Sequence, residues 1–231
     1  DPLASVDAGL ARRPEIVMPG RIAACAIAAV VVAVVTAGRL RAPEARQPPG
    51  WELVVLGIAQ DAGIPHLGCE QGLCWSIRSG ARKPERVASI GLVNRTLGKS
   101  YLIDATPDFR SQVHDLNGGT PPDGIFLTHG HIGHYTGLMY LGRESIDARH
   151  VPVFATDRMQ GFLRANGPWS LLVSRGNIDL RPLPADRAIE LEGGLRVTAF
   201  IVPHRDEFTD TVGFLVEGSL RKALYIPDID Q

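Results

Sequence analysis

Three histidines stand within six positions of the sequence, in the stretch "FLTHGHIGHYTGL" at residues 126–138. They are His129, His131 and His134, and they directly follow a short apolar run that is typical of a buried strand. Imidazole nitrogen is the commonest protein ligand for metals. A His-x-His pair on a loop after a strand can direct two such nitrogens at one point, and the third histidine can face the same place from the next helix. The spacing therefore predicts a site for zinc, or alternatively for iron, manganese or nickel.

Further candidate ligands stand at the ends of other apolar runs. The run "TAFIVPH" ends in His204, "LYIPD" ends in Asp228 and "YLID" ends in Asp104. A single aspartate at such a place is more often a turn or helix-cap residue. Taken together, however, the three places repeat the pattern of the histidine cluster, in which a strand is followed at once by a residue that can bind metal.

The elements that must position these residues are predicted by the same sequence. Short apolar runs bounded by glycine, lysine or proline indicate strands, and helical spacing between some of them indicates an α/β domain of sheets covered by helices. We predict helices over 109–116, 137–146 and 157–166, and strands over 51–59, 88–94, 100–105, 124–128, 151–155, 211–218 and 222–228, with a hairpin over 188–204.

The motifs "LIDATPDFR", "LTHGHIGH", "VPH" and "IPD" together resemble those of the metallo-β-lactamase-fold superfamily. Within it, "GIAQDAGIPHLGCEQGLC" and "LIDATPDFRSQ" resemble the pyrroloquinoline quinone biosynthesis protein B branch, which is close to cyclic phosphodiesterases of phosphonate metabolism. The resemblance covers residues 51–231 and implies an αββα sandwich with a metal site along one edge, between the sheets. We expect this domain to be truncated at its C-terminal end, because "ALYIPDIDQ" stops just after a core strand.

The resemblance implies a role for most of the candidate residues. His129, His131 and His204 would hold a first metal. Asp228 would bridge this metal to a second one. Because position 133 has no acid, Asp228 is also the remaining candidate for a catalytic residue that orients or deprotonates the attacking water. Asp104 would orient a ligand from behind, as the partners of metal-binding residues commonly do.

The second metal is expected to be weak or absent. The family pattern is His-x-His-x-Asp-His, in which the aspartate binds the second metal, whereas this chain has Gly133 in its place. Apart from a final family histidine that would lie beyond Gln231, only His134 and Asp228 would remain, and two ligands do not make a tight site. Asp206 and Glu207 could lend a carboxylate, although acids on a solvated loop are the more ordinary interpretation. We therefore predict one firmly held catalytic metal, zinc first, with iron or manganese as alternatives.

The stretch "HLGCEQGLC" offers a separate group of residues, namely His66, Cys69 and Cys74. Related branches carry a structural zinc here, so that one interpretation is a zinc held by these three side chains. Two free or buried thiols are an equal alternative. A Cys69–Cys74 disulfide is a third, if the compartment is oxidising.

The first fifty residues are predicted to lie outside the domain. Residues 1–20 read as an unstructured tail and the proline-rich residues 41–50 as a linker. Between them, residues 21–40 contain an uncharged run at 22–38 that is flanked by arginines, which fits a signal peptide or a membrane anchor. We therefore expect the domain to be exported, to the periplasm or the exterior, or to be anchored to the membrane.

Composition limits the functions that these motifs could serve. A net charge of −1 provides no electrostatic footprint for duplex nucleic acid, so we expect a small-molecule substrate; the oligomeric state is not readable. The first hypothesis is a metal-dependent hydrolase that activates a metal-bound water for attack on an ester, lactone or phosphodiester. The second is a metal-dependent oxidation or hydroxylation step, or a carrier role, in pyrroloquinoline quinone biosynthesis. The third is a non-catalytic binding protein whose metal site is degenerate.

Overall fold

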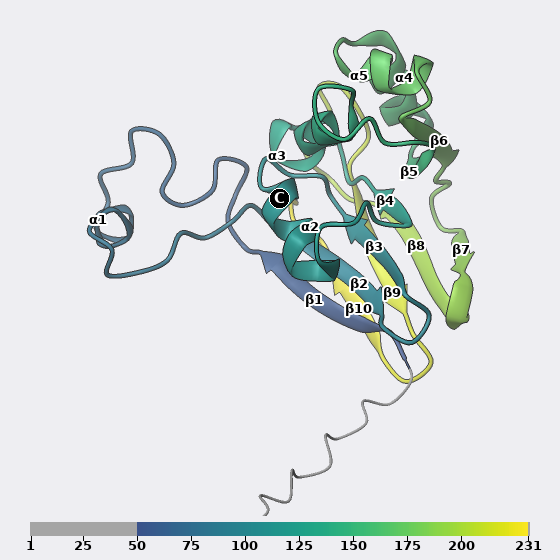
Figure 1. Cartoon of the computed structure of the whole chain (residues 1–231), viewed down its shortest axis with the longest axis horizontal. Coiled ribbons are helices and arrows are strands. Elements are labelled where there is room, and N and C mark those ends of the chain that lie inside the picture. Colours follow the sequence, from purple (N-terminus) through teal and green to yellow (C-terminus); the bar gives the residue numbers. More distant parts are fainter. Residues whose placement is uncertain (1–49, 231) are drawn as a thin grey trace, which may run out of the picture. The chain divides into compact units, whose positions relative to one another are not determined.

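The computed structural model describes residues 50–230, so the predicted tail, the predicted leader and nearly all of the predicted linker lie outside the described residues. The described chain forms two β-sheets (Figure 1). The first sheet has six strands in the order β1 (Glu52–Gly57), β2 (Ser89–Asn94), β3 (Lys99–Ile103), β4 (Gly124–Phe126), β5 (Val151–Ala155) and β6 (Ile178–Pro182). The second has four strands in the order β10 (Lys222–Tyr225), β9 (Val212–Glu217), β8 (Leu195–Ile201) and β7 (Ala188–Leu191).

Strand direction brings several strand ends to one edge of each sheet. Strand β2 is antiparallel to both β1 and β3, whereas β3, β4, β5 and β6 pair in parallel. Strands β1, β3 and β4 therefore run the same way, and their carboxyl ends meet. The second sheet is antiparallel throughout, so that β8 and β10 share a direction. Residues that directly follow these strands can consequently lie close together.

The hydrophobic core has two parts, one on each face of the first sheet. In β3, Tyr101 and Ile103 pack with residues of the second sheet, whereas Leu102 between them packs on the opposite side. This alternation follows from the two-residue repeat of a strand, and it shows that β3 is buried on both faces. Phe126 of β4 and Phe214 of β9 meet edge to face between the sheets, with ring centroids 5.9 Å apart.

Helices cover the outer face of the first sheet. Buried side chains of α2 (Phe109–Asn117) and α4 (Asp157–Ala165), such as Val113 and Leu163, belong to the same core cluster as Leu102. The layers in the described residues are thus helix, sheet and sheet, which accounts for three layers of the expected αββα order. The predicted α/β class is confirmed. The other helices are α1 (Gly72–Arg78), α3 (Ile132–Tyr135), α5 (Trp169–Ser174) and the 3₁₀ helices η1 (Thr136–Leu141) and η2 (Glu192–Gly194).

Some predicted elements differ from the structure. The helix expected over 137–146 is the shorter 3₁₀ helix η1, because the chain becomes extended at Gly142 with φ −75° and ψ 178°. Helices α1 and α5 and strand β6 were not predicted. Only the first residue of β6 is buried, so this edge strand lacks the alternation on which the prediction of strands depends.

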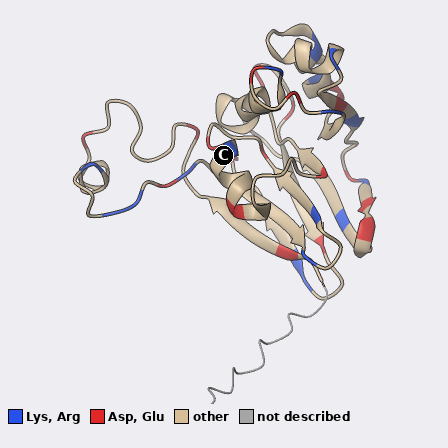
Figure 2. Cartoon of the chain, viewed as in Figure 1, with Lys and Arg blue, Asp and Glu red and all other residues tan. Residues whose placement is uncertain are grey.

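Charged residues of both signs are interspersed in the view of Figure 2. Some of them pair across neighbouring strands, as Arg196 of β8 does with Glu217 of β9 at 2.8 Å. Within residues 50–230, no helix has the length and the apolar character that a membrane span requires. The expected signal peptide or anchor at residues 22–38 lies outside this part and stays a prediction.

Candidate metal centre

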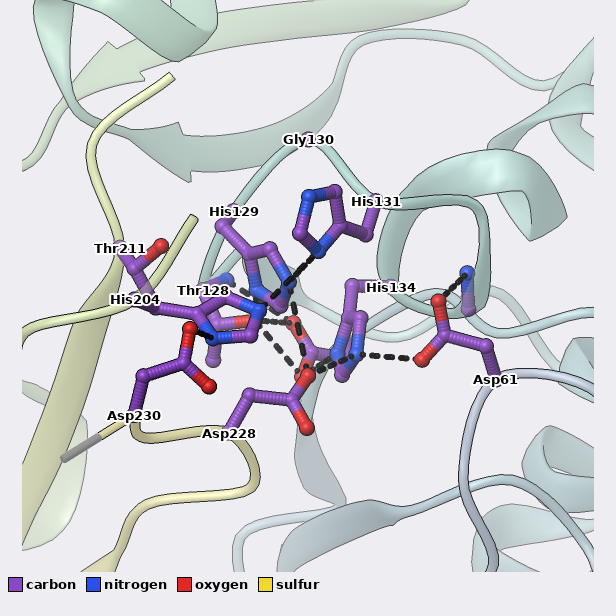
Figure 3. A network of polar contacts seen from close by, with 12 residues as sticks. Asp61, Thr128, His129, Gly130, His131, His134, His204, Thr211, Asp228 and Asp230 are labelled. Carbon is purple, nitrogen blue, oxygen red and sulfur yellow. Dashed lines mark hydrogen bonds and ion pairs between the residues drawn. The ribbon is translucent and has the colours of Figure 1, made fainter. Parts of the chain in front are cut away.

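The candidate ligands follow strand ends, and the fold brings those ends together. His129 comes just after β4, His204 follows β8 and Asp228 follows β10, while His131 caps α3 and His134 lies within it. Helix α3 is held against the end of β3, because the backbone N–H of Ala105 donates to the carbonyl of His134 at 2.9 Å. The four histidines and Asp228 face a common centre in Figure 3.

Three imidazole nitrogens form the first donor group. Nε2 of His129 lies 2.9 Å from Nδ1 of His131, and Nε2 of His204 lies 3.2 Å from the same atom. Three nitrogens that converge so closely are the donor set of a tetrahedral zinc site that keeps one position open. The structure therefore brings together the three residues that the sequence assigns to the first metal, and their donor atoms fit a divalent cation.

A second group shares His129 and adds His134 and Asp228. Oδ2 of Asp228 lies 3.4 Å from Nε2 of His129 and 2.8 Å from Nε2 of His134. Nε2 of His134 is buried and makes no well-aligned hydrogen bond, despite this short distance. A buried polar atom without such a bond is costly unless something else binds it. Its orientation toward carboxylates fits a cation as the missing partner.

In each of the four histidines, the ring nitrogen that points away from the centre lies close to an oxygen atom of another residue. Such contacts fix the tautomer and orientation of a histidine ring and leave its other nitrogen free for a metal. The sequence did not predict Thr128 and Asp230 as partners of these histidines. Thr128 directly precedes the predicted ligand His129, and Asp230 stands two residues after the predicted ligand Asp228. The pairs are His129 Nδ1 with Thr128 Oγ1 at 3.0 Å, His131 Nε2 with Glu207 Oε2 at 2.8 Å, His134 Nδ1 with Asp104 Oδ2 at 2.8 Å, and His204 Nδ1 with Asp230 Oδ2 at 3.0 Å.

Asp104 lies behind the centre and is fully buried. Its carboxylate accepts hydrogen bonds from the backbone N–H and the hydroxyl of Thr128, both at 2.9 Å, besides its contact with His134. Its φ of 69° is in the left-handed region, which few residues other than glycine, asparagine and aspartate adopt readily. This arrangement suits the orienting role that the family resemblance implies for Asp104.

The histidine environments have opposite effects on protonation. Burial, helped by the nearby His134 and His131, lowers the pKa of His129 to about 3, so this ring is neutral and has a free lone pair at neutral pH. Burial also lowers the pKa of His134, but the carboxylates of Asp104, Asp228 and Asp61 outweigh it and raise that pKa well above its usual value. Metal binding at His134 would therefore compete with protonation of this ring.

Asp61 is a residue of this centre that the sequence had not predicted. It lies in the loop after β1, and its Oδ1 is 3.4 Å from Nε2 of His134 (Figure 3). The close contact with the His134 ring outweighs partial burial and lowers the pKa of the Asp61 carboxyl, so the group is ionised. Asp206, which the sequence offered as a carboxylate for the second metal, instead accepts a hydrogen bond from the hydroxyl of Thr211, with 3.1 Å between its Oδ1 and Thr211 Oγ1.

The cysteine group is a disulfide in the structure, which corrects two of the three interpretations, the zinc site and the two free or buried thiols. Cys69 and Cys74 are joined by a disulfide, and both residues are buried. Sulfur atoms bonded to each other cannot serve as thiolate ligands. His66 is exposed, and its Nδ1 contacts the neighbouring carbonyl of Leu67 at 2.9 Å.

Replacing both cysteines distinguishes a disulfide from a structural zinc site at Cys69 and Cys74. The double variant Cys69→Ser with Cys74→Ser should retain the metal content of the natural protein, since neither sulfur binds metal. Elemental analysis of the two purified proteins makes the comparison, and thiol labelling of the unfolded, unreduced natural protein should leave both cysteines unmodified. A loss of one metal equivalent in the double variant would restore the structural-zinc interpretation.

The comparisons with known proteins agree with this geometry. The model of the β-lactamase superfamily domain matches residues 99–231, and the chain belongs to that superfamily. Coenzyme PQQ synthesis protein B of Methylobacterium radiotolerans is 30% identical over 201 residues, and that of Ruegeria pomeroyi is 27% identical over 196 residues. Each alignment covers 76% of this chain, which spans 64% of the length of either relative. The predicted resemblance to this branch is confirmed.

Solved structures show the same fold. Zinc-bound PqqB from Methylobacterium extorquens superposes with a TM-score of 0.66 at 22% identity, covering 77% of this chain and 65% of that one. A diphosphatase of the PhnP family has a TM-score of 0.55 at 28% identity, covering 72% of this chain and 62% of that one. The similarity to PqqB at this identity is evidence for the fold alone.

Proposed function

We propose that this chain forms the metal-binding part of a metal-dependent hydrolase that acts on an ester, a lactone or a phosphodiester. The observation that carries the proposal is the convergence of three imidazole nitrogens, from His129, His131 and His204, beside the carboxylate of Asp228. The similarity to a diphosphatase supports a phosphoester or diphosphate-type substrate among these classes. Zinc is the proposed metal because three converging imidazole nitrogens are a donor set that suits it.

A divalent metal bound here would supply Lewis acidity and would lower the pKa of water to about 7, which makes hydroxide available at neutral pH. The residues of the chain would provide the rest. Asp228 is partly accessible, with a fifth of its side chain exposed, and its carboxylate can orient a water and accept a proton from it. Its close contact with the His134 ring lowers the pKa of Asp228, so the carboxylate is available in its ionised form.

A second candidate is a role in pyrroloquinoline quinone biosynthesis. The names of the curated relatives favour it, since several are coenzyme PQQ synthesis protein B. In this case the metal would assist oxidation or hydroxylation of a cofactor precursor, or the protein would carry that compound. Consumption of oxygen in the presence of a precursor, with iron as the native metal, would favour this candidate over hydrolysis.

Removal of metal tests the hydrolase. The full-length protein should hydrolyse a chromogenic phosphodiester such as bis(4-nitrophenyl) phosphate, or a chromogenic ester or lactone, and chelation should reduce the rate to that of the uncatalysed reaction. Addition of zinc after the chelator is removed should restore the rate, because the donors belong to a folded centre. Rates unchanged by thorough chelation, or no turnover of any of these substrate classes by the zinc-loaded protein, would contradict the proposal.

A further inference from the structure

The side chain of Asp61 fills the space that Gly133 leaves open. A Cβ atom built on Gly133 would lie 2.6 Å from Cγ, 2.7 Å from Cα and 2.8 Å from Oδ1 of Asp61. Real Cβ atoms do not approach other atoms so closely, so Asp61 can adopt its position only because residue 133 has no side chain. The place of the family's missing aspartate is therefore taken by a carboxylate from a distant part of the chain.

The contacts of Asp61 are those of a residue that belongs to the metal centre. Its Oδ1 lies 3.4 Å from Nε2 of His134, and its Oδ2 accepts a long hydrogen bond of 3.4 Å from the backbone N–H of Gly133. About a third of the Asp61 side chain is exposed, so its carboxylate lies where the buried ring of His134 meets the solvent. Turning about its side-chain bonds lets the carboxylate move toward the centre without moving the loop.

The atom that Asp61 faces is the buried nitrogen without a well-aligned hydrogen bond. Nε2 of His134 lies between Oδ2 of Asp228 at 2.8 Å and Oδ1 of Asp61 at 3.4 Å, as Figure 3 shows. One neutral nitrogen and two carboxylates form a common ligand set for zinc, iron or manganese. Asp61 would bring the number of protein ligands for a second ion from two to three.

We propose that Asp61 replaces the aspartate that the family pattern has at position 133, and that it binds a second divalent metal together with His134 and Asp228. This inference rests on the proposed function, because it presumes that the first metal is bound by the three histidines. It also changes the expectation drawn from Gly133. The glycine is not a sign of a lost second site, since it makes room for a ligand supplied by the loop after β1.

The test is the number of metal ions that the full-length protein binds, which does not depend on turnover. Metal-free protein is titrated with Co²⁺, and equivalents bound are counted by equilibrium dialysis and by the absorption of the bound ion. The natural protein should bind two equivalents. Asp61→Asn, which preserves the shape of the side chain, should keep the first and weaken the second more than about 100-fold, because loss of mere partners of ligands already costs 10- to 100-fold. Glu70→Gln removes the same charge from an exposed residue of the same connection and should bind two equivalents.

A second variant displaces Asp61 without changing it. Gly133→Ala places a Cβ 2.6 Å from Cγ and 2.7 Å from the backbone Cα of Asp61, so Asp61 has to move away, and the variant should also lose the second equivalent while retaining the first. Circular dichroism should show an unchanged fold in both variants. One equivalent in the natural protein, or two equivalents of unchanged affinity in Asp61→Asn, would refute the role of Asp61 and leave the hydrolase proposal standing. Absence of any bound metal in the natural protein would refute both proposals.

Discussion

His131→Ala should lose most of the catalytic metal and, with it, all hydrolysis above the uncatalysed rate. Nδ1 of His131 lies 2.9 Å from Nε2 of His129 and 3.2 Å from Nε2 of His204, so it is central to the first donor group. Its removal leaves two nitrogens, which are too few to hold zinc firmly. We expect the affinity for the first metal to fall by more than about 100-fold, since even loss of a ligand's partner costs 10- to 100-fold. Elemental analysis after gel filtration measures the effect.

The matched control is His114→Ala. His114 is an exposed histidine in the last turn of α2, and it belongs to neither donor group. This variant should keep its metal and its activity. If His131→Ala, folded by circular dichroism, retained the metal content of the natural protein, the assignment of the first metal to the three histidines would be wrong.

Asp104→Ala should have the largest effect on stability. Its removal leaves the N–H and hydroxyl of Thr128 and Nδ1 of His134 without their buried partner. Breaking a buried pair on one side costs about 3–5 kcal/mol in the free energy of unfolding. Alanine also adopts a φ of 69° less readily than aspartate does, which adds to the loss. Denaturant unfolding of the metal-free protein gives the difference without a contribution from bound metal.

Asp104→Asn separates the contacts from the conformation. Asparagine keeps the size of the side chain, tolerates the left-handed region and can still accept a hydrogen bond from Thr128, but it lacks the negative charge. We expect a smaller loss of stability than for alanine, with weaker metal binding at His134 because the charge that orients its ring is gone. Equal stability of the alanine variant and the natural protein would show that the buried network contributes nothing.

The sequence by itself determined the class of fold and the first donor group. His129, His131 and His134 are separated by one or two residues, so local geometry alone brings them close once a strand ends before them. His204 and Asp228 were found because each directly follows an apolar run, and strands that run in the same direction end at the same edge. Short-range patterns of this kind are recorded in the order of residues, which is why they could be predicted.

Only the tertiary structure decided how the second donor group is built. Asp61 and Gly133 are 72 positions apart. Nothing in the local pattern around either residue indicates that the carboxylate of Asp61 lies in the space beside Gly133. The contact between Glu207 and His131 and the choice of a disulfide over a zinc site were likewise open in the sequence. The contact between Glu207 and His131 depends on how two loops pack at the end of the sheets, and the disulfide depends on how the chain folds between Cys69 and Cys74. Neither conformation is encoded by a spacing or a periodicity.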